Sequence, residues 1–543
     1  MERPMTQTTS KLAKGTMILT ITSLLVKILS AIYRVPFQNL VGDEGFYVYQ
    51  QVYPIYGIAM TLALSGIPVF FSKIIAEKDN QLEKEEAIQT FYPLFVVLSL
   101  GLFLGTFFGG TCLARLMGDA KLSSLIRMTS FVFLLAPAVA TYRGYFQGEL
   151  QMAPTAISQL WEQVIRVATI LLAAFFFTKT RMSLYQMGTW AISGAVLGIG
   201  AAYLVLVVYS RKQLKKEIRL PKITKMSKQS FKESVRNVKR FGYEGGVVCI
   251  YSAYLILFQL IDSFFIKNLL VRIGMSETQA KVTKGIFDRG QPLVQLGLVV
   301  ATSLMAVYLP VLTKYYVTKR KEKFLFATSL YLRLTFVVGL AASCGLACIL
   351  PFVNRGLFGS TAQNTALMIF VFAVFFMSLI QAYQTVFQSY SCLKPVLIAA
   401  FLGILGKLVA IVLLTKYFGI NGASASTLLG LVCCVSVLHL CFKYSWKVTT
   451  FSAFFYLKLL LCIGIMGVIL VLYKNGVGYL FGVNLKRMFA LCLALMGVLI
   501  GATIFLLSIL KLKVFSTREW LLIPYGKKLL SLKNRNGEKH EIR

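Results

Sequence analysis

The sequence predicts an all-α membrane protein that crosses the bilayer about fourteen times. Long apolar runs recur from one end of the chain to the other; 57% of the 543 residues are hydrophobic and 14% are charged. Soluble domains contain about 25% charged residues. The apolar runs are continuous rather than alternating, which favours spanning helices over a β-barrel.

Fourteen segments are long and apolar enough to span a bilayer as helices. Their expected bounds are 16–38, 46–71, 89–112, 123–142, 154–178, 187–209, 243–266, 287–310, 325–350, 365–388, 395–416, 421–442, 450–473 and 487–510. The first segment is too long and too charged for a cleaved signal peptide, so we expect an uncleaved helix. Ser65–Pro68 (SGIP) predicts a bend in the second segment.

The first segment carries a polar stripe, because six polar residues follow one another at steps of three or four. They are Thr16, Thr20, Ser23, Lys27, Ser30 and Arg34. A lipid-facing Lys or Arg near the bilayer centre costs about 2.5–3.5 kcal/mol. Lys27 and Arg34 on one stripe therefore indicate a water-filled cavity inside a helix bundle. Our hypothesis is that this cavity binds an anionic group.

The net charge of +36 comes mainly from loops on one side of the membrane. Roughly 36 of the 57 Lys and Arg residues lie at the termini and in alternate loops, which is typical of the cytoplasmic side. We therefore expect a multi-pass protein of the cell (plasma) membrane with both termini in the cytoplasm. The basic loops then face anionic membrane lipid, and nucleic acid is not an expected partner.

The longest internal loop, residues 210–242, divides the first twelve segments six and six. We expect an N-terminal lobe over residues 1–222, which includes the start of this basic linker, and a C-terminal lobe over 223–442. Residues 443–543 then hold the last two segments and a basic cytoplasmic tail. This division depends on hydropathy alone.

Charged residues inside other segments are further candidates for the site. In the fifth segment, Glu162 and Arg166 are spaced i,i+4, which favours either a structural ion pair or a contact with substrate. In the seventh, Asp262 either pairs with a cation, binds a coupling ion or is exposed near the outer end. Asp288 and Arg289 open the eighth segment. The first, second, seventh and eighth segments together place two to three cations around one cavity, which suits a pyrophosphate.

Three further cations receive no role from the sequence. Arg333 and Lys458 lie where a long side chain reaches the interface, and Lys407, closer to mid-span, stays open. The ten cysteines lie mostly in apolar runs and the two histidines have no partner cluster, so we expect no metal site and no cofactor. P-loop, HExxH and GxSxG motifs are absent from the sequence, and we expect a protein that is not an enzyme.

Four stretches carry a resemblance to a known family. They are KGTMILTITSLLVKILSAIYRVPF, YQQVYPIYGIAMTLALSGIPVFF, YRGYFQGELQMAPTAISQLWEQVIRV and FDRGQPLVQLG. As a set they resemble the Gram-positive polysaccharide-export branch of the multidrug/oligosaccharidyl-lipid/polysaccharide (MOP) exporter superfamily. Within it, the chain is similar to MurJ-type lipid II flippases and to spore-cortex proteins.

The resemblance implies a V-shaped, two-lobed flippase that works by alternating access. It would move undecaprenyl-pyrophosphate-linked peptidoglycan precursor, lipid II, from the inner to the outer leaflet, with cell-wall synthesis proteins as candidate partners. The last two segments would form a groove for the lipid tail. The cavity arginines of the family match Lys27, Arg34 and Arg289, with Asp288 beside the last. An acid of the first outer loop matches Glu44 approximately.

Three other functions stay open at this point. The first is a flippase for another polyprenyl-pyrophosphate-linked glycan, such as a capsule, teichoic-type or spore-cortex unit. The second is a cation-coupled drug exporter, for which an acidic cavity would be expected. The third is a membrane scaffold of the division machinery that uses the basic loops and tail.

Overall fold

The computed structural model describes residues 19, 21–213, 231–446, 453–482 and 485–520, and every regular element in these ranges is a helix. Within them, 12 continuous helical stretches are long and apolar enough to cross a membrane. Two of these stretches, Ile21–Ala76 and Lys394–Trp446, are interrupted by a glycine with positive φ. Each half is long enough to span a bilayer, so the prediction of about fourteen crossing helices in an all-α protein is confirmed.

The chain reverses at both of these glycines. Gly42 has a φ of 72° and Gly419 a φ of 55°, conformations that glycine adopts without a steric cost. After Gly42 the chain runs back antiparallel to the preceding helix, as shown by the hydroxyls of Tyr33 and Tyr49, which lie 3.1 Å apart. After Gly419 it does the same, since Lys407 and Thr427 are hydrogen-bonded at 3.1 Å. The two reversals fall where the sequence predicts the first and second, and the eleventh and twelfth, segments to separate.

The helices pack into two units, Met1–Val299 with Leu393–Cys434 (unit 1) and Val300–Cys392 with Val435–Arg543 (unit 2). Helical residues 21–32 open unit 1. Its further elements are α2 (Arg34–Thr61), the π-helical turn η1 (Leu62–Gly66), α3 (Ile67–Ala76), α4 (Gln81–Phe108), α5 (Gly110–Leu116), the 3₁₀ turn η2 (Ala120–Leu122), α6 (Ser123–Gly148), α7 (Met152–Lys179), α8 (Leu184–Gln213), α9 (Phe231–Arg240), the π-helical turn η3 (Phe241–Gly245), α10 (Gly246–Ser252), α11 (Tyr254–Arg272) and α12 (Glu277–Asp288).

Two helices, α13 (Gly290–Val317) and α17 (Lys394–Trp446), continue from one unit into the other. Unit 2 also contains α14 (Lys321–Phe358), α15 (Asn364–Phe370), α16 (Ala373–Ser389), α18 (Ala453–Phe481), α19 (Arg487–Lys511) and α20 (Thr517–Trp520). The predicted lobe boundaries and the V shape stay predictions. Residues 214–230 of the predicted linker and the tail after Trp520 lie outside the described residues.

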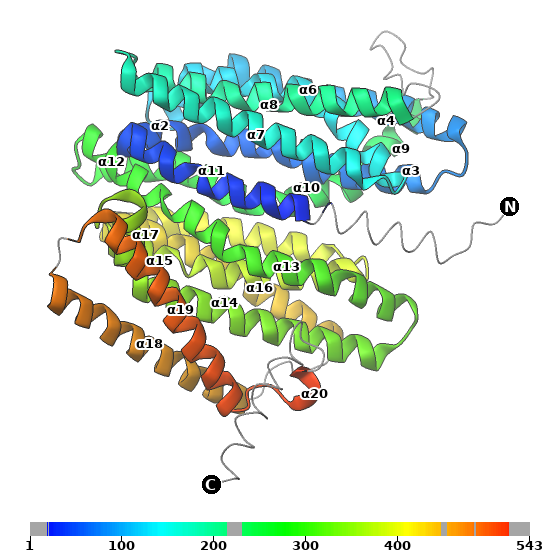
Figure 1. The fold of residues 1–543 in the computed structure, drawn as a ribbon. Helices are drawn as coiled ribbons and strands as arrows, with labels where there is room; N and C mark the ends of the chain where they lie inside the picture. Colours follow the sequence, from blue (N-terminus) through cyan, green and yellow to red (C-terminus); the bar gives the residue numbers. More distant parts are fainter. Residues whose placement is uncertain (1–18, 20, 214–230, 447–452, 483–484, 521–543) are drawn as a thin grey trace. The chain divides into compact units, whose positions relative to one another are not determined.

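In unit 1, α2 packs against α6, α7, α8, α11 and α12. Figure 1 shows α2, α7 and α8 running side by side. The contact with α11 is close at Gly57, where a Cβ would lie 2.9 Å from Ile256, and Gln51 donates to the carbonyl oxygen of Ser263 at 2.5 Å. The bend predicted at Ser65–Pro68 coincides with the π-helical turn η1.

Ion pairs join three loop regions at one end of unit 1, which we name the Arg240 end. Arg240 pairs with Glu77 at 2.6 Å, and Lys84 pairs with Glu149 at 2.6 Å. These contacts bring together the α3–α4 loop, the end of α6 and the end of α9. They are the regions that the charge bias predicts to be cytoplasmic; the sidedness itself stays a prediction.

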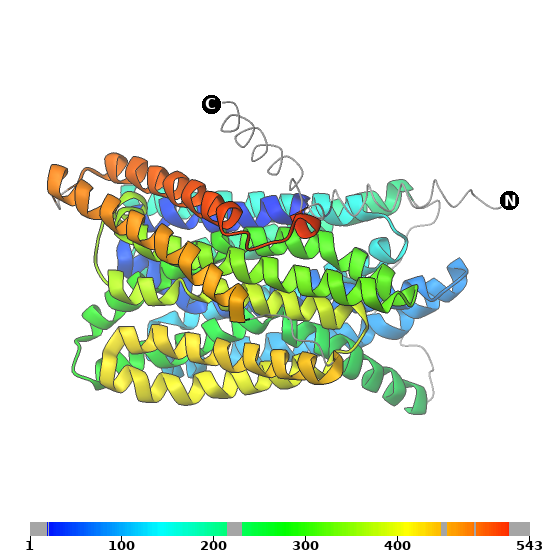
Figure 2. The same cartoon turned by 90° about the horizontal axis from the view of Figure 1, so that it is seen from below.

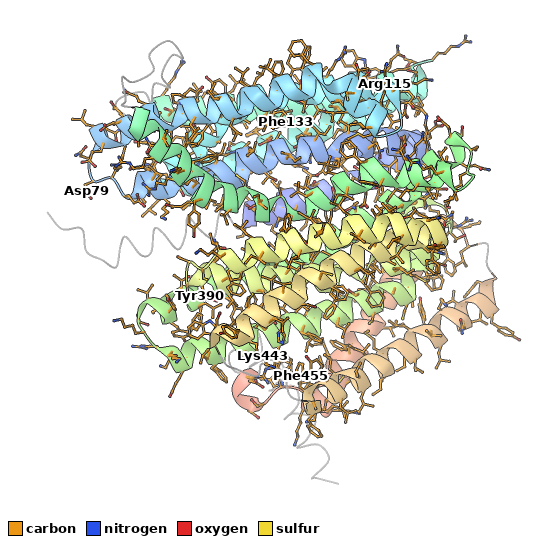
Figure 3. All side chains as sticks on the ribbon, turned by 180° about the vertical axis from the view of Figure 1, so that it is seen from behind. Asp79, Arg115, Phe133, Tyr390, Lys443 and Phe455 are labelled. Atoms are coloured by element: carbon orange, nitrogen blue, oxygen red, sulfur yellow. The ribbon has the colours of Figure 1, made fainter. Side chains whose placement is uncertain are left out.

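A second group of polar residues closes the other end, which we name the Asp119 end. Tyr185 donates to Asp119 at 2.6 Å, Lys281 donates to Tyr185 at 2.8 Å, and Lys281 Nζ lies 3.2 Å from the Asp119 carboxylate. We call these three residues the Asp119 cluster. Figure 3 shows that Asp79 of the α3–α4 loop and Arg115 of α5 lie at opposite ends of unit 1, with Phe133 of α6 between them.

In unit 2, the two additional C-terminal helices α18 and α19 pack on each other and on α14, and both views show α18 and α19 side by side (Figures 1 and 2). Arg333 of α14 pairs with Glu519 of α20. The ion pair links the short helix α20 to α14, and the interfacial position of Arg333 stays a prediction. Lys458 donates to the carbonyl oxygen of Lys513 at 3.3 Å.

Candidate functional site

The polar stripe of the first segment divides between surface and interior. Lys27 is exposed, whereas Arg34, the first residue of α2, is 0% exposed. The Arg34 guanidinium lies over the ring of Tyr53 at 4.5 Å from its centroid. Among the described residues it has no carboxylate within ion-pair distance, and its polar neighbour is the Tyr33 hydroxyl. Because arginine stays protonated in proteins, Arg34 is a buried positive charge without a counter-charge beside it.

A second guanidinium of the same kind comes from α7. Arg166 is 2% exposed and donates through Nη2 to Gln163 at 2.7 Å and to Ser30 at 3.2 Å. In the described part of the chain it forms no ion pair, and beyond Gln163 and Ser30 it interacts with the hydroxyl of Tyr53. It lies over the rings of Tyr56 at 4.9 Å and Tyr33 at 5.5 Å.

Four tyrosines surround the two arginines, and we name the six residues the Arg–Tyr site: Arg34, Arg166, Tyr33, Tyr49, Tyr53 and Tyr56. The ring of Tyr33 lies within 6.0 Å of Arg34 and 5.5 Å of Arg166, so it borders both guanidinium groups. Aromatic faces stabilise a cation, and phenolic hydroxyls donate hydrogen bonds to oxyanions. Two guanidinium groups with hydroxyl donors form a set that can bind a phosphate or diphosphate with several bonds at once.

The expected ion pair between Glu162 and Arg166 is wrong. Glu162 pairs with Arg143 of α6 at 2.8 Å, and both side chains are nearly inaccessible, at 4% and 0% exposed. Arg143 also donates to Ser158 at 3.0 Å and to the carbonyl oxygen of Ala63 in η1 at 3.3 Å. The i,i+4 rule considers one helix alone; here a residue of a neighbouring helix lies closer, and Arg166 turns toward the tyrosines.

Arg289 follows α12 and pairs with Asp43 at 2.5 Å, a residue that also accepts from Gln38 at 2.5 Å. Arg289 is 2% exposed, so this predicted anion ligand lies inside unit 1 in a contact with an acid. Asp288 is also buried, and it pairs with Lys284 at 2.6 Å. Glu44 is half-buried beside Asp43 and forms no ion pair with any described residue.

The structure answers two questions that the sequence leaves open. Asp262 is 2% exposed, which excludes simple exposure, and it pairs with Lys407 at 2.8 Å. Lys407 is 0% exposed and also donates to Thr427 at 3.1 Å. The pair joins α11 to both halves of α17 within unit 1.

These charged residues lie within electrostatic range of one another. Asp288 interacts with Lys284, with Asp262 and with Arg34, and Lys407 interacts with Asp262, Lys284 and Asp288. The first, seventh, eighth and eleventh segments therefore contribute to one buried network. In unit 1, Arg34 thus lies within electrostatic range of Asp288, and the Lys27 side chain is solvent-accessible; a shared anion site stays a prediction.

Three charged residues that form these ion pairs were not among the site residues predicted from the sequence. Arg143, Lys284 and Asp43 fall just outside the expected segments, because the helices extend several residues beyond the apolar runs. The sequence signal for Arg143 was that it is the one charged residue in the apolar stretch 128–148. Helical spacing of Lys284 and Asp288, i,i+4, was a signal for that pair.

Comparison with known proteins gives consistent matches along the chain. The family model for polysaccharide biosynthesis proteins matches residues 12–316. The Bacillus subtilis (strain 168) protein called uncharacterized membrane protein YabM is 34% identical over 537 residues, which cover 97% of each chain. The lipid II flippase MurJ of the same organism is 23% identical over 521 residues, or 92% of this chain and 94% of MurJ.

A solved structure of the lipid II flippase MurJ in an inward closed conformation has the same fold, with a TM-score of 0.67 at 16% identity; the match covers 91% of this chain and 99% of that one. The predicted fold and the predicted resemblance to MurJ-type proteins are therefore confirmed. Because the family model spans more than half of the chain, this protein belongs to the family of polysaccharide biosynthesis proteins.

Proposed function

We propose that this protein is a flippase that moves a polyprenyl-diphosphate-linked glycan precursor from the inner to the outer leaflet of the cell membrane by alternating access. Lipid II is the first candidate substrate. In this proposal both termini lie in the cytoplasm, the basic loops face anionic lipid, and cell-wall synthesis proteins receive the product. The protein transports its substrate and leaves its covalent bonds unchanged.

One observation carries the proposal: Arg34 and Arg166 are buried beside the same tyrosine ring without a carboxylate partner in the described chain. A buried charge without a counter-charge is costly, and in unit 1 the other buried cations, such as Arg143 and Lys407, have acidic partners. A diphosphate supplies the missing negative charge and enough oxygens for both guanidinium groups. A bound diphosphate then offsets the free-energy cost of burying the two arginines, which favours binding of the headgroup.

Two of the predicted anion ligands, Lys27 and Arg289, have supporting roles in this proposal. Lys27 lies on the same helix as Ser23, which donates to Gln159 of α7 at 3.2 Å, and we propose that it attracts the diphosphate before the buried site binds it. Arg289 must exchange its contact with Asp43 for one with the substrate.

Lys27→Arg should be tolerated and Lys27→Glu should abolish transport; normal growth with Lys27→Glu would remove the first helix from the anion pathway.

A second candidate substrate is a different polyprenyl-diphosphate-linked glycan, such as a capsule, teichoic-type or spore-cortex unit. The comparisons favour keeping it, because identity is 34% to YabM and 23% to MurJ. The diphosphate chemistry at the Arg–Tyr site is the same for both substrates, so the two candidates differ only in the groups attached beyond the diphosphate. A cation-coupled drug exporter is disfavoured, because the unpartnered charges of this site are positive.

The test is growth of a bacterium depleted of its lipid II flippase, combined with leaflet-resolved labelling of lipid II. If lipid II is the substrate, the wild-type protein restores growth and outer-leaflet lipid II, whereas Arg34→Ala and Arg166→Ala at equal membrane levels do not. Failure of the wild type despite normal membrane levels would favour the second candidate. Restored growth with both arginine variants would contradict anion transport and favour a scaffold.

A further inference from the structure

One long contact joins the second predicted segment, α2–η1–α3, to the seventh, α9–η3–α10–α11, within unit 1. The two run antiparallel, since residues of rising number in the first contact residues of falling number in the second. From the Asp119 end to the Arg240 end, the pairs are Gln51 with Ser263, Gly57 with Ile256, Gly66 with Cys249, Lys73 with Glu244 and Glu77 with Arg240. Figure 1 shows α3, α9 and α10 close together at one end of the unit.

Both helical stretches of this contact are interrupted at the same depth. The π-helical turn η1 separates α2 from α3, and Ala253 separates α10 from α11. The contact of Gly57 with Ile256 lies on one side of Ala253, and that of Gly66, the last residue of η1, with Cys249 lies on the other. The two interruptions therefore face each other. Such breaks are places where a helix bends, and two that face each other allow α3 and α9–η3–α10 to pivot against the rest.

The two halves of the contact are held by different kinds of interaction. In the half toward the Asp119 end, Gln51 is 0% exposed and donates to the carbonyl oxygen of Ser263 at 2.5 Å. At the Arg240 end, the side chains of Lys73 and Glu244 are 60% and 30% exposed, and that of Arg240 is 35% exposed. Exposed ion pairs stabilise little and are screened by salt, whereas an unpaired buried polar group is costly. The Arg240 end is therefore the end that separates more easily.

The interruption at η1 is linked to the Arg–Tyr site by direct contacts. Arg143 donates to the carbonyl oxygen of Ala63 in η1 at 3.3 Å and pairs with Glu162 of α7 at 2.8 Å. Arg166 lies one turn after Glu162 on the same helix, and Tyr56, whose ring lies under Arg166, precedes η1 on α2. A change of bend at η1 therefore acts on both sides of the Arg166–Tyr56 contact.

We propose that α3 and α9–η3–α10 form a gate that opens at the Arg240 end about η1 and Ala253, and that its opening admits the diphosphate headgroup to the Arg–Tyr site. The opening follows from the contacts above, and its role in transport rests on the proposed function. In the closed gate, Glu244 pairs with Lys73 at 2.5 Å and with Arg240 at 3.2 Å, so this one acid joins both sides. The ring of Phe241 in η3 also packs on Phe70 of α3, with centroids 5.2 Å apart.

A native cysteine reports whether the gate opens. Cys249 of α10 is half-buried against Gly66, where a Cβ would overlap its sulfur. Separation of α10 from η1 should therefore expose this thiol. The experiment alkylates the full-length protein in lipid nanodiscs with a charged, membrane-impermeant maleimide and measures the rate at each cysteine by mass spectrometry. Cys434 of α17, which is 2% exposed in the same unit, is the internal reference for unfolding.

Glu244→Gln removes both ion pairs of Glu244 and should raise the alkylation rate of Cys249 by about 3–20-fold, the effect of losing two exposed pairs. A change from about 0.05 M to about 0.5 M KCl should raise the wild-type rate in the same direction, because salt screens these pairs. Glu149→Gln is the matched control. It breaks an ion pair with Lys84 at the same end, outside α3 and α10, and should leave the Cys249 rate unchanged.

Equal Cys249 rates in the wild type and Glu244→Gln at both salt concentrations would overturn the gate, as would a parallel rise at Cys434. The salt series on the wild type decides the matter if Glu244→Gln does not fold. Undecaprenyl pyrophosphate should change the Cys249 rate in the wild type and not in Arg34→Ala. A rate that responds to Glu244→Gln and to salt but not to this lipid would support the gate and contradict the proposed function.

Discussion

The buried ion pair between Arg143 and Glu162 gives a sharp prediction about stability. Replacement of either residue by methionine leaves the other as a buried charge without its partner, which costs about 3–5 kcal/mol. Arg143→Met removes the donor to three acceptors, Glu162, Ser158 and the carbonyl oxygen of Ala63, whereas Glu162→Met removes the one charged acceptor of Arg143. Replacement of both residues removes the charges together and should cost much less than the sum of the single variants.

The double-mutant cycle distinguishes the observed partner from the expected one. The coupling energy between Arg143→Met and Glu162→Met should be about 2–4 kcal/mol, whereas that between Arg166→Met and Glu162→Met should be on the order of 0.5 kcal/mol, the value for an i,i+4 neighbour. Reversible unfolding of the purified protein in mixed micelles provides the free energies. Equal coupling in both cycles, or a larger value for Arg166, would refute the assignment of the pair.

Two further predictions concern close contacts in unit 1. Gly285→Ala should lower the unfolding temperature because the new methyl group overlaps the carbonyl oxygen of Asp43, with a cost of about 1–3 kcal/mol, whereas Gly464→Ala, which meets no neighbour, should be neutral. An unchanged melting temperature in Gly285→Ala would show that α12 and α2 are not in contact. Asp119→Lys and Lys281→Asp should each destabilise the protein, and the exchanged double variant should regain at least half of the loss in the same thermal assay. A double variant no better than the worse single one would argue against the pair.

The sequence predicted the helices well, because long apolar runs leave few alternatives in a bilayer. It also located both chain reversals, since Gly42 and Gly419 fall between adjacent runs. It underestimated helix lengths at the polar ends, where hydropathy gives no signal. Lys284 and Arg143 lie in those extensions, and each turned out to be a partner of a residue that the sequence had singled out.

Arg34 shows what periodicity can reveal about a site. Its place on a polar stripe predicted an interior position, and the structure buries it completely. Lys27 lies on the same stripe, and its side chain is solvent-accessible, since a stripe defines a face of one helix and not what covers each turn of it. For Arg166 the sequence left open an ion pair with Glu162 or a contact with substrate, and in the structure Glu162 pairs with Arg143 instead. The approach of Arg166 to Tyr33 and Tyr56 depends on packing between α7 and α2, which a single helix does not encode.

The central claim is that Arg34 and Arg166 together hold a diphosphate inside the membrane domain. Its most direct test is the affinity of the purified full-length protein in nanodiscs for undecaprenyl pyrophosphate, with Arg127→Ala as a matched loss of a surface arginine that bonds Thr111. A charge-assisted hydrogen bond is worth about 1.5–3 kcal/mol, so Arg34→Ala and Arg166→Ala should each weaken binding by roughly 10–100-fold, and Arg127→Ala should not. Wild-type affinity in both buried-arginine variants would contradict the account.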